Sequence, residues 1–388
     1  MAFAQRITAA KQGSHARVSA QRLWSKRGWA LIAIVSLVLV APAARAGDEL
    51  TFVSWGGAYT RSQMLAFVRP YEHKTGVSLN VLDYAGGLDD IRSQVRSLNV
   101  KWDVVDLELS DAIRGCDEGL LERISPSDLS PGPDGQDPSH DFIPGGLTPC
   151  AVGTVVWSTV IAYDTRRFKN HPPRSLRDFF DLKRFPGRRG LRKTPKGNLE
   201  WALIASGVPP GQVYKRLGTE QGLERAFAML DRIKPAIVWW TAGAEAPRML
   251  ETGRVAMASA YNGRIYDAAK TRNAPLRIIW DHQIWNIDLL AIPKGDPKRK
   301  QALNFIRFAT APAQLAAQAR YIPYGPVRRS ALAQVPADVR AHLPTAQKDF
   351  SQALRINAAW WAKHFEQVDQ RFQDWLEQPV QVPRRLPR

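Results

Sequence analysis

The sequence lacks the motifs that mark several common enzyme classes. It contains no Walker, Rossmann, HExxH or GxSxG motif and no internal repeat, so no short motif argues for an enzyme. Low-complexity tracts are also missing, and the hydrophobic fraction of 45% is ordinary for a folded protein. The chain has 388 residues, which exceeds the length that a single hydrophobic core usually supports. This length predicts two lobes.

Cysteine is scarce, since only Cys116 and Cys150 occur. In an oxidising compartment a lone pair usually forms one disulfide, which predicts a bridge between them. Two free buried thiols are the alternative. No histidine lies near either cysteine at ligand spacing, so neither a metal site nor a cysteine nucleophile is expected there. We expect no metal and no cofactor.

Long hydrophobic runs are absent apart from one near the N-terminus. The apolar run 29–40 follows a basic region and precedes Ala44-Arg45-Ala46, and it is too short for a comfortable membrane span. This order predicts a secretory signal over 1–46, cleaved after Ala46, and therefore a periplasmic protein. An uncleaved anchor is the alternative, and no cysteine follows the run to make a lipoprotein.

Basic residues outnumber acidic ones by 54 to 36, and an excess remains when the signal segment is left out. Such a balance would suit nucleic acid. The lysines and arginines are scattered along the chain rather than grouped, however, and an exported protein rarely meets nucleic acid. We therefore expect a solvated basic surface and no nucleic-acid partner.

Strand and helix patterns alternate along the mature chain. An apolar strand ends at Ser54, a helical pattern runs from Met64 to a stop at Gly76, and 103–107 reads as a buried strand. This alternation predicts an α/β fold with mostly parallel sheets flanked by helices. In such sheets ligands bind beyond the carboxyl ends of the strands. The residues on that rim are Trp55, Gly56, Gly57 and Glu108.

Two glycines directly follow the first strand. Gly56 and Gly57 carry no Cβ, so the backbone can approach a ligand closely there. The free N–H groups of the next helix favour an anion or a polar ligand atom at the same place. Plain loop chemistry is the alternative explanation of this pattern.

A second α/β unit follows the apolar run 152–163. Its expected strands are 237–240, 255–260 and 276–279, and a separate strand at 285–292 crosses back to the first lobe. The lobes are then expected at 47–157 plus 287–335 for lobe 1 and at 158–286 plus 336–388 for lobe 2.

Seven short segments then occur in a recognisable order. They are 54–59 (SWGGAY), 101–105 (KWDVV), 116–122 (CDEGLLE), 185–191 (FPGRRGL), 261–264 (YNGR), 288–295 (DLLAIPKG) and 321–326 (YIPYGP). With the signal segment, this set resembles extracytoplasmic solute-binding proteins of the spermidine/putrescine type over nearly the whole mature chain. The resemblance implies a two-lobed periplasmic-binding-protein fold of type II, whose hinge is crossed more than once. It also implies a monomer without chemistry of its own, which delivers a solute to an ABC permease in the inner membrane.

The polyamine site of these proteins implies roles for several residues. Trp55 and Tyr261 match ligand-stacking aromatics, and Asp288 matches the acid that holds an ammonium group. Aromatic faces attract ammonium groups by about 0.5–2 kcal/mol each, and a carboxylate adds charge-assisted hydrogen bonds. Of the neighbours Trp239 and Trp240, one should face the core and one the cleft. The expected ligand-binding residues are Trp55, Gly56, Gly57, Glu108, Trp240, Tyr261, Asp288, Tyr321 and Tyr324.

Two departures from the polyamine pattern stand out. Gly56-Gly57 replaces an acid, and Lys196 lies where acids are expected and would repel a second ammonium group. The ligand is therefore expected to be a polyamine-like or other amine-containing solute. One possibility of this kind is a ligand that also has an anionic end, which the Gly56 and Gly57 amides and Lys196 would bind. The alternatives are an exported hydrolase with Asp288 and Glu108 as an acid–base pair, or a ligand-sensing adaptor.

Overall fold

The computed structural model describes residues 49–346 and 348–379. The expected signal segment, 1–46, lies outside these residues. The described residues belong to one compact unit. Within the described residues, none of the helices combines the length and the apolar character that a membrane span requires.

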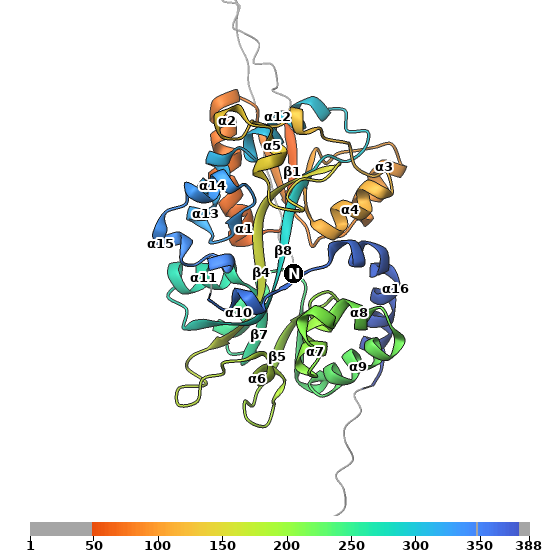
Figure 1. The fold of residues 1–388 in the computed structure, drawn as a ribbon, viewed down its shortest axis with the longest axis vertical. Coiled ribbons are helices and arrows are strands. Elements are labelled where there is room, and N and C mark those ends of the chain that lie inside the picture. The colour runs from red at the N-terminus through yellow and green to blue at the C-terminus, as the bar shows by residue number, and fades with distance from the viewer. Residues whose placement is uncertain (1–48, 347, 380–388) are drawn as a thin grey trace, which may run out of the picture. The chain divides into compact units, whose positions relative to one another are not determined.

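One mixed sheet of ten strands runs through this unit (Figure 1). The strands are β1 (Leu50–Ser54), β2 (Leu79–Asp83), β3 (Val104–Glu108), β4 (Ala151–Asp164), β5 (Arg189–Arg192), β6 (Ile237–Trp240), β7 (Met257–Tyr261), β8 (Leu276–Ala291), β9 (Gly325–Pro326) and β10 (Leu354–Arg355). Their order is β2-β1-β3-β8-β4-β7-β5-β6, and β9 and β10 pair with β4 and β8. The groups β2-β1-β3 and β7-β5-β6 are parallel inside. The long antiparallel strands β4 and β8 join these two groups.

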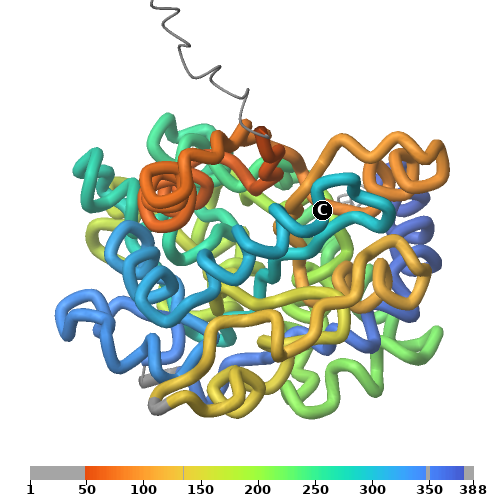
Figure 2. The backbone as a smooth tube through the Cα atoms, turned by 90° about the horizontal axis from the view of Figure 1, so that it is seen from above, coloured from red at the N-terminus to blue at the C-terminus, as the bar shows by residue number. Residues whose placement is uncertain are grey.

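Helices cover both parallel groups. They are α1 (Gly57–Gln63), α2 (Arg69–Thr75), α3 (Asp89–Arg96), α4 (Leu109–Asp117), α5 (Pro138–Asp141), α6 (Leu176–Phe180), α7 (Asn198–Ala205), α8 (Val213–Leu217), α9 (Glu220–Asp231), α10 (Glu245–Glu251), α11 (Asn262–Thr271), α12 (Arg299–Ala309), α13 (Pro312–Tyr321), α14 (Arg329–Ala333), α15 (Ala337–Arg340) and α16 (Ala358–Glu377). The predicted stop at Gly76 is confirmed, because this residue has φ 75° and ends α2. The π-helical turn Met64–Val68 joins α1 to α2, and α13 packs against this turn and α1 (Figure 2).

Two large hydrophobic clusters lie along the sheet. The first includes β1, β3 and residues 287–292, and the second packs α7, α9 and α16 against the far parts of β4 and β8. On β4 the boundary between the two clusters falls between Val156 and Ile161, and on β8 it falls between Ile287 and Ile284. A smaller cluster surrounds β7 and α10. The structure thus has the two-lobed α/β architecture, while the residue limits of the lobes stay a prediction.

Strand β8 is longer than the sequence predicted. The expected strands 276–279 and 285–292 are one strand of 16 residues, so the prediction of a break between them is wrong. The polar run Asp281-His282-Gln283 looks like a loop, but it forms hydrogen bonds with distant parts of the chain. Asp281 accepts a hydrogen bond from the backbone N–H of Leu176, and Gln283 is fully buried. His282 has φ 50°, which marks a local irregularity in the strand.

The predicted disulfide between Cys116 and Cys150 is confirmed, with the two Cα atoms 5.7 Å apart. It joins the last turn of α4 to the residue before β4. Both cysteines belong to or border the first hydrophobic cluster. The bridge therefore fastens α4, which begins directly after Glu108, to one of the two long central strands.

Candidate functional site

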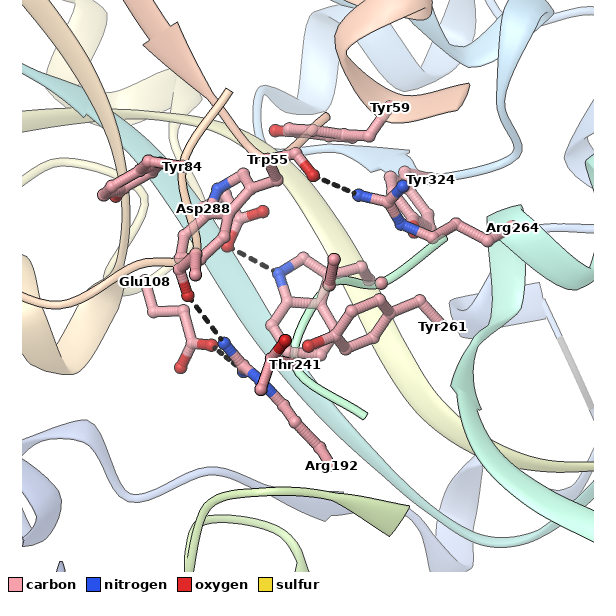
Figure 3. A pocket seen from close by; sticks show the side chains of 14 residues that line it. Trp55, Tyr59, Tyr84, Glu108, Arg192, Thr241, Tyr261, Arg264, Asp288 and Tyr324 are labelled. Carbon is pink, nitrogen blue, oxygen red and sulfur yellow. Dashed lines mark hydrogen bonds and ion pairs between the residues drawn. The ribbon is translucent and has the colours of Figure 1, made fainter. Parts of the chain in front are cut away.

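A pocket with an empty volume of about 430 Å³ lies where the two parallel groups of strands meet the central pair (Figure 3). Its aromatic and charged lining residues are Trp55, Tyr59, Tyr84, Glu108, Trp157, Arg192, Tyr261, Arg264, Asp288 and Tyr324. Several follow or end a strand: β1 precedes Trp55, β3 ends at Glu108, β5 ends at Arg192 and β7 ends at Tyr261. The pocket thus lies at the carboxyl ends of parallel strands.

Asp288 is the acid of the pocket that has no cationic partner. It lies on β8 opposite Glu108 of β3 and is 5% exposed. Its Oδ1 accepts a hydrogen bond of 2.6 Å from the indole N–H of Trp157, and it forms no salt bridge among the described residues. Burial, with the charges of Asp106 and Glu108, raises the pKa of Asp288 well above the ordinary value. A cation bound next to this carboxyl group would therefore lower its pKa and favour its ionised form.

Asp106 supports the pocket from behind. Its carboxylate accepts hydrogen bonds from the indole of Trp55 at 3.2 Å, the hydroxyl of Tyr59 at 3.0 Å and the amide of Gln63 at 2.5 Å. Burial raises the pKa of Asp106 to about 7, although these donors oppose the shift. Asp106 thus orients Trp55 and Tyr59 and adds negative potential near Asp288.

Glu108 has a different environment from Asp288. Its carboxylate is 2.7 Å from Nη1 of Arg192 and 2.8 Å from Nζ of Lys196. Burial alone would raise the pKa of Glu108, but Lys196 and Arg192 outweigh burial and lower it to about 2. Glu108 therefore stays ionised and holds two cations. Its side chain does not cap α4, and it is not a free acid for the ligand.

Arg264 of α11 fills the place that the sequence assigned to a ligand. Its Nη1 donates to the carbonyl oxygen of Gly56 at 2.9 Å and its Nη2 to that of Trp55 at 3.0 Å. A Cβ on Gly57 would lie 2.8 Å from Nη1, and one on Gly243 would lie 2.7 Å from Nε. The glycine turn thus admits a guanidinium group, and Gly56 and Gly57 do not line the pocket. Among the described residues Arg264 has no carboxylate partner.

Aromatic rings form the remaining walls of the pocket. Trp157 and Tyr261 are in edge contact with ring centroids 4.9 Å apart, and Tyr59 and Tyr324 lie 5.6 Å apart. The guanidinium carbon of Arg192 lies 6.0 Å from the ring centroid of Tyr261. Burial raises the pKa of Tyr261 to about 12, so its hydroxyl stays protonated at neutral pH. These rings suit the methylene chain and the ammonium group of a small amine.

The expected site residues thus separate into three groups. Trp55, Glu108, Tyr261, Asp288 and Tyr324 line the pocket. Gly56, Gly57 and Trp240 do not line it. Trp240 is 1% exposed and packs edge-on against Tyr261. Tyr321 is 46% exposed and does not line the pocket. Lys196, expected to meet an anionic ligand end, is held by Glu108 and by Ser110 at 2.7 Å.

Sequence reasoning missed Tyr59, Trp157, Arg192 and Arg264 as pocket residues. Tyr59 and Arg264 belong to the segments SWGGAY and YNGR, so their place next to glycines was a usable signal. Arg192 is the last residue of β5, which the rule for strand ends could have indicated. Trp157 lies within a continuous apolar run, and nothing in that run distinguishes it from core residues. Among the described residues, no group of three His, Cys, Asp or Glu side chains could hold a metal ion.

Known proteins share both the sequence and the fold. The sequence model described as bacterial extracellular solute-binding protein matches residues 66–345. A γ-aminobutyric acid-binding protein from Pseudomonas aeruginosa is 40% identical over 344 residues, which are 89% of this chain and 95% of that protein. Two solved structures cover most of both chains. The periplasmic binding protein MotA from Agrobacterium tumefaciens with glucopine has a TM-score of 0.78, 26% identity and coverage of 84% and 99%. A GABA receptor has a TM-score of 0.74, 28% identity and coverage of 87% and 100%.

Proposed function

This chain belongs to the bacterial extracellular solute-binding proteins, and from that premise we propose that it captures a small zwitterionic amino acid of the γ-aminobutyric acid (GABA) type for an ABC permease. It is a binding protein and not an enzyme. In this proposal residues 1–46 direct export to the periplasm, and the two lobes close around the solute. The ligand is thus an amine, as the sequence indicated, but an amino acid rather than a polyamine.

One observation carries this proposal: within the described part of the chain, the same pocket contains an acid without a cationic partner and a guanidinium group without an acidic one. Asp288 lies among aromatic rings and would hold the ligand's ammonium group. Arg264 and Arg192 would donate to its carboxylate. A diamine would instead bring a second ammonium group towards these two guanidinium groups, which disfavours spermidine or putrescine. The relative named for γ-aminobutyric acid supports the same conclusion.

Ligand series that differ by one charged group test the proposal. GABA is expected to raise the melting temperature, because a ligand at 100 times its Kd adds about 2.7 kcal/mol to the free energy of unfolding. Butyrate lacks the amine and propylamine lacks the carboxylate, so each should bind at least about tenfold more weakly, about 1.4 kcal/mol. Thermal-shift and calorimetric titrations measure both effects. Putrescine binding more tightly than GABA would contradict the proposal, as would no binding of any member.

Binding of GABA is expected to release protons. In the free protein burial raises the pKa of Asp288, so its carboxyl group keeps a proton where an ordinary aspartate has lost it. An ammonium group beside it favours the ionised form and lowers this pKa. The affinity should therefore rise with pH until the raised pKa of Asp288 is passed. Calorimetry in two buffers of different ionisation enthalpy counts the protons, and a pH-independent affinity without proton release would rule this out.

A further inference from the structure

A second chamber adjoins the pocket. It has an empty volume of about 400 Å³, and four of its lining residues, Glu108, Trp157, Arg192 and Tyr261, also line the first pocket. The far side of the chamber is formed by Lys196 and Trp240, among others. Only side chains of the shared wall therefore separate the two spaces, and Arg192 is one of them.

The second chamber contains an unused hydrogen-bond donor. Trp240 is 1% exposed, and its indole Nε1 has no hydrogen-bond partner in the part of the chain that the structure describes. An unsatisfied buried N–H group is unfavourable, so a ligand atom that accepts its hydrogen bond would gain binding free energy. Because Trp240 packs edge-on against Tyr261, with centroids 5.6 Å apart, its ring is fixed next to the shared wall.

Further donors line the same chamber. The hydroxyl of Ser259 accepts a hydrogen bond from the backbone N–H of Arg192 at 3.3 Å, which leaves its own proton to donate. Lys196 uses two of its three N–H groups on Glu108 and Ser110. The carboxylate of Glu108 is shared by two cations, Arg192 and Lys196. The chamber thus offers several hydrogen-bond donors, and a second acid, Asp111, lies 4.0 Å from Nζ of Lys196.

We propose that this second chamber is a ligand subsite that receives the terminal carboxylate of amino acids longer than GABA. The amine stays at Asp288, and the chain passes Arg192, so that the carboxylate accepts hydrogen bonds from Trp240 and Lys196. The inference rests on the proposed function, because it places the amine in the first pocket. It assigns a substrate class, ω-amino acids of extended length, that the first pocket alone would not select.

Titration of a length series tests the subsite. GABA, 5-aminovalerate, 6-aminohexanoate and 7-aminoheptanoate are titrated into the wild-type protein and the Trp240→Phe variant. We expect at least one longer acid to bind as tightly as GABA. In the variant, which keeps an aromatic ring but loses the N–H, the ratio of long-chain to GABA affinity should fall five- to tenfold. Trp239→Phe is the matched control, since Trp239 packs on Phe372 and Trp375 and should leave this ratio unchanged.

The outcomes separate the two proposals. If GABA binds but every longer acid binds at least 50-fold more weakly, the subsite is refuted and the proposed function stands. The subsite is also refuted if Trp240→Phe leaves the ratio of long-chain to GABA affinity unchanged, which is the result expected if the chamber holds only water. If neither GABA nor any longer acid binds the wild type, both proposals fail. Should Trp240→Phe not fold, Ser259→Ala replaces it, with a smaller fall in the same ratio.

Discussion

Replacing Asp288 with asparagine is expected to lower the affinity for GABA by about 100-fold or more. Asparagine has nearly the same shape and its oxygen can still accept the N–H of Trp157. It cannot ionise, so the ammonium group loses a charged partner in a buried pocket, where such a loss costs about 2–5 kcal/mol. Calorimetric titration of the purified variant measures the change, and the melting temperature without ligand verifies folding.

Asp141→Asn is the matched control for this experiment. Asp141 is also a buried aspartate, but its carboxylate lies 2.6 Å from Nε of Arg328, outside the pocket. This change should lower the melting temperature and leave the GABA affinity within about twofold, because substitutions at distant sites without shared partners act independently. Equal losses of affinity in both variants would mean that Asp288 acts only through stability. Proton release on binding should also disappear in Asp288→Asn alone.

Removing the disulfide with Cys116→Ala and Cys150→Ala is expected to lower the free energy of unfolding by about 3–4 kcal/mol. The bridge spans 34 residues, and closing a loop of that size restricts the unfolded chain by about this amount. Unfolding in urea measures the effect as a lower midpoint. The native structure should persist, because Cys150 lies within a large hydrophobic cluster that does not depend on the bridge.

Reductant provides the control for the disulfide. Under dithiothreitol the wild-type midpoint should fall towards that of the double variant, whereas the variant's midpoint should not move. A double variant as stable as the oxidised protein would show that the covalent link adds nothing to the packing of α4 on β4. The GABA affinity serves as a second measurement, and it should stay within about threefold because no pocket residue is changed.

Much of the fold followed from the sequence because its local signals agree with each other. Strand β6 has the predicted limits, and helix α2 ends at the predicted glycine. The break in β8 was wrong for a physical reason: Asp281, His282 and Gln283 are polar, and only partners far away in the chain make a strand favourable there. Local patterns contain no information about such partners.

The charges of the pocket were harder to predict than its location. Strand ends placed Trp55, Glu108 and Tyr261 near one another, since the carboxyl ends of parallel strands meet. Whether an acid is free or paired depends on side chains from other segments, however. Arg192 reaches Glu108 across 84 positions of sequence, and Arg264 reaches Gly56 across 208. Pairings of this kind arise only in the folded chain, so the sequence could not distinguish Glu108 from Asp288.

The two long central strands give the site a mechanical property. The hydrophobic clusters change over on β4 and β8 within residues 156–161 and 284–287, next to Trp157 and Asp288. The β4–β8 register also shifts between Thr159 and Ile161, so the pairing is irregular at this level. Asp288, the proposed ammonium-binding group, therefore lies on the strand segments where the two clusters meet. We therefore expect a substitution of Ile161, which lines neither pocket, to change the ligand affinity by altering the pairing of β4 with β8.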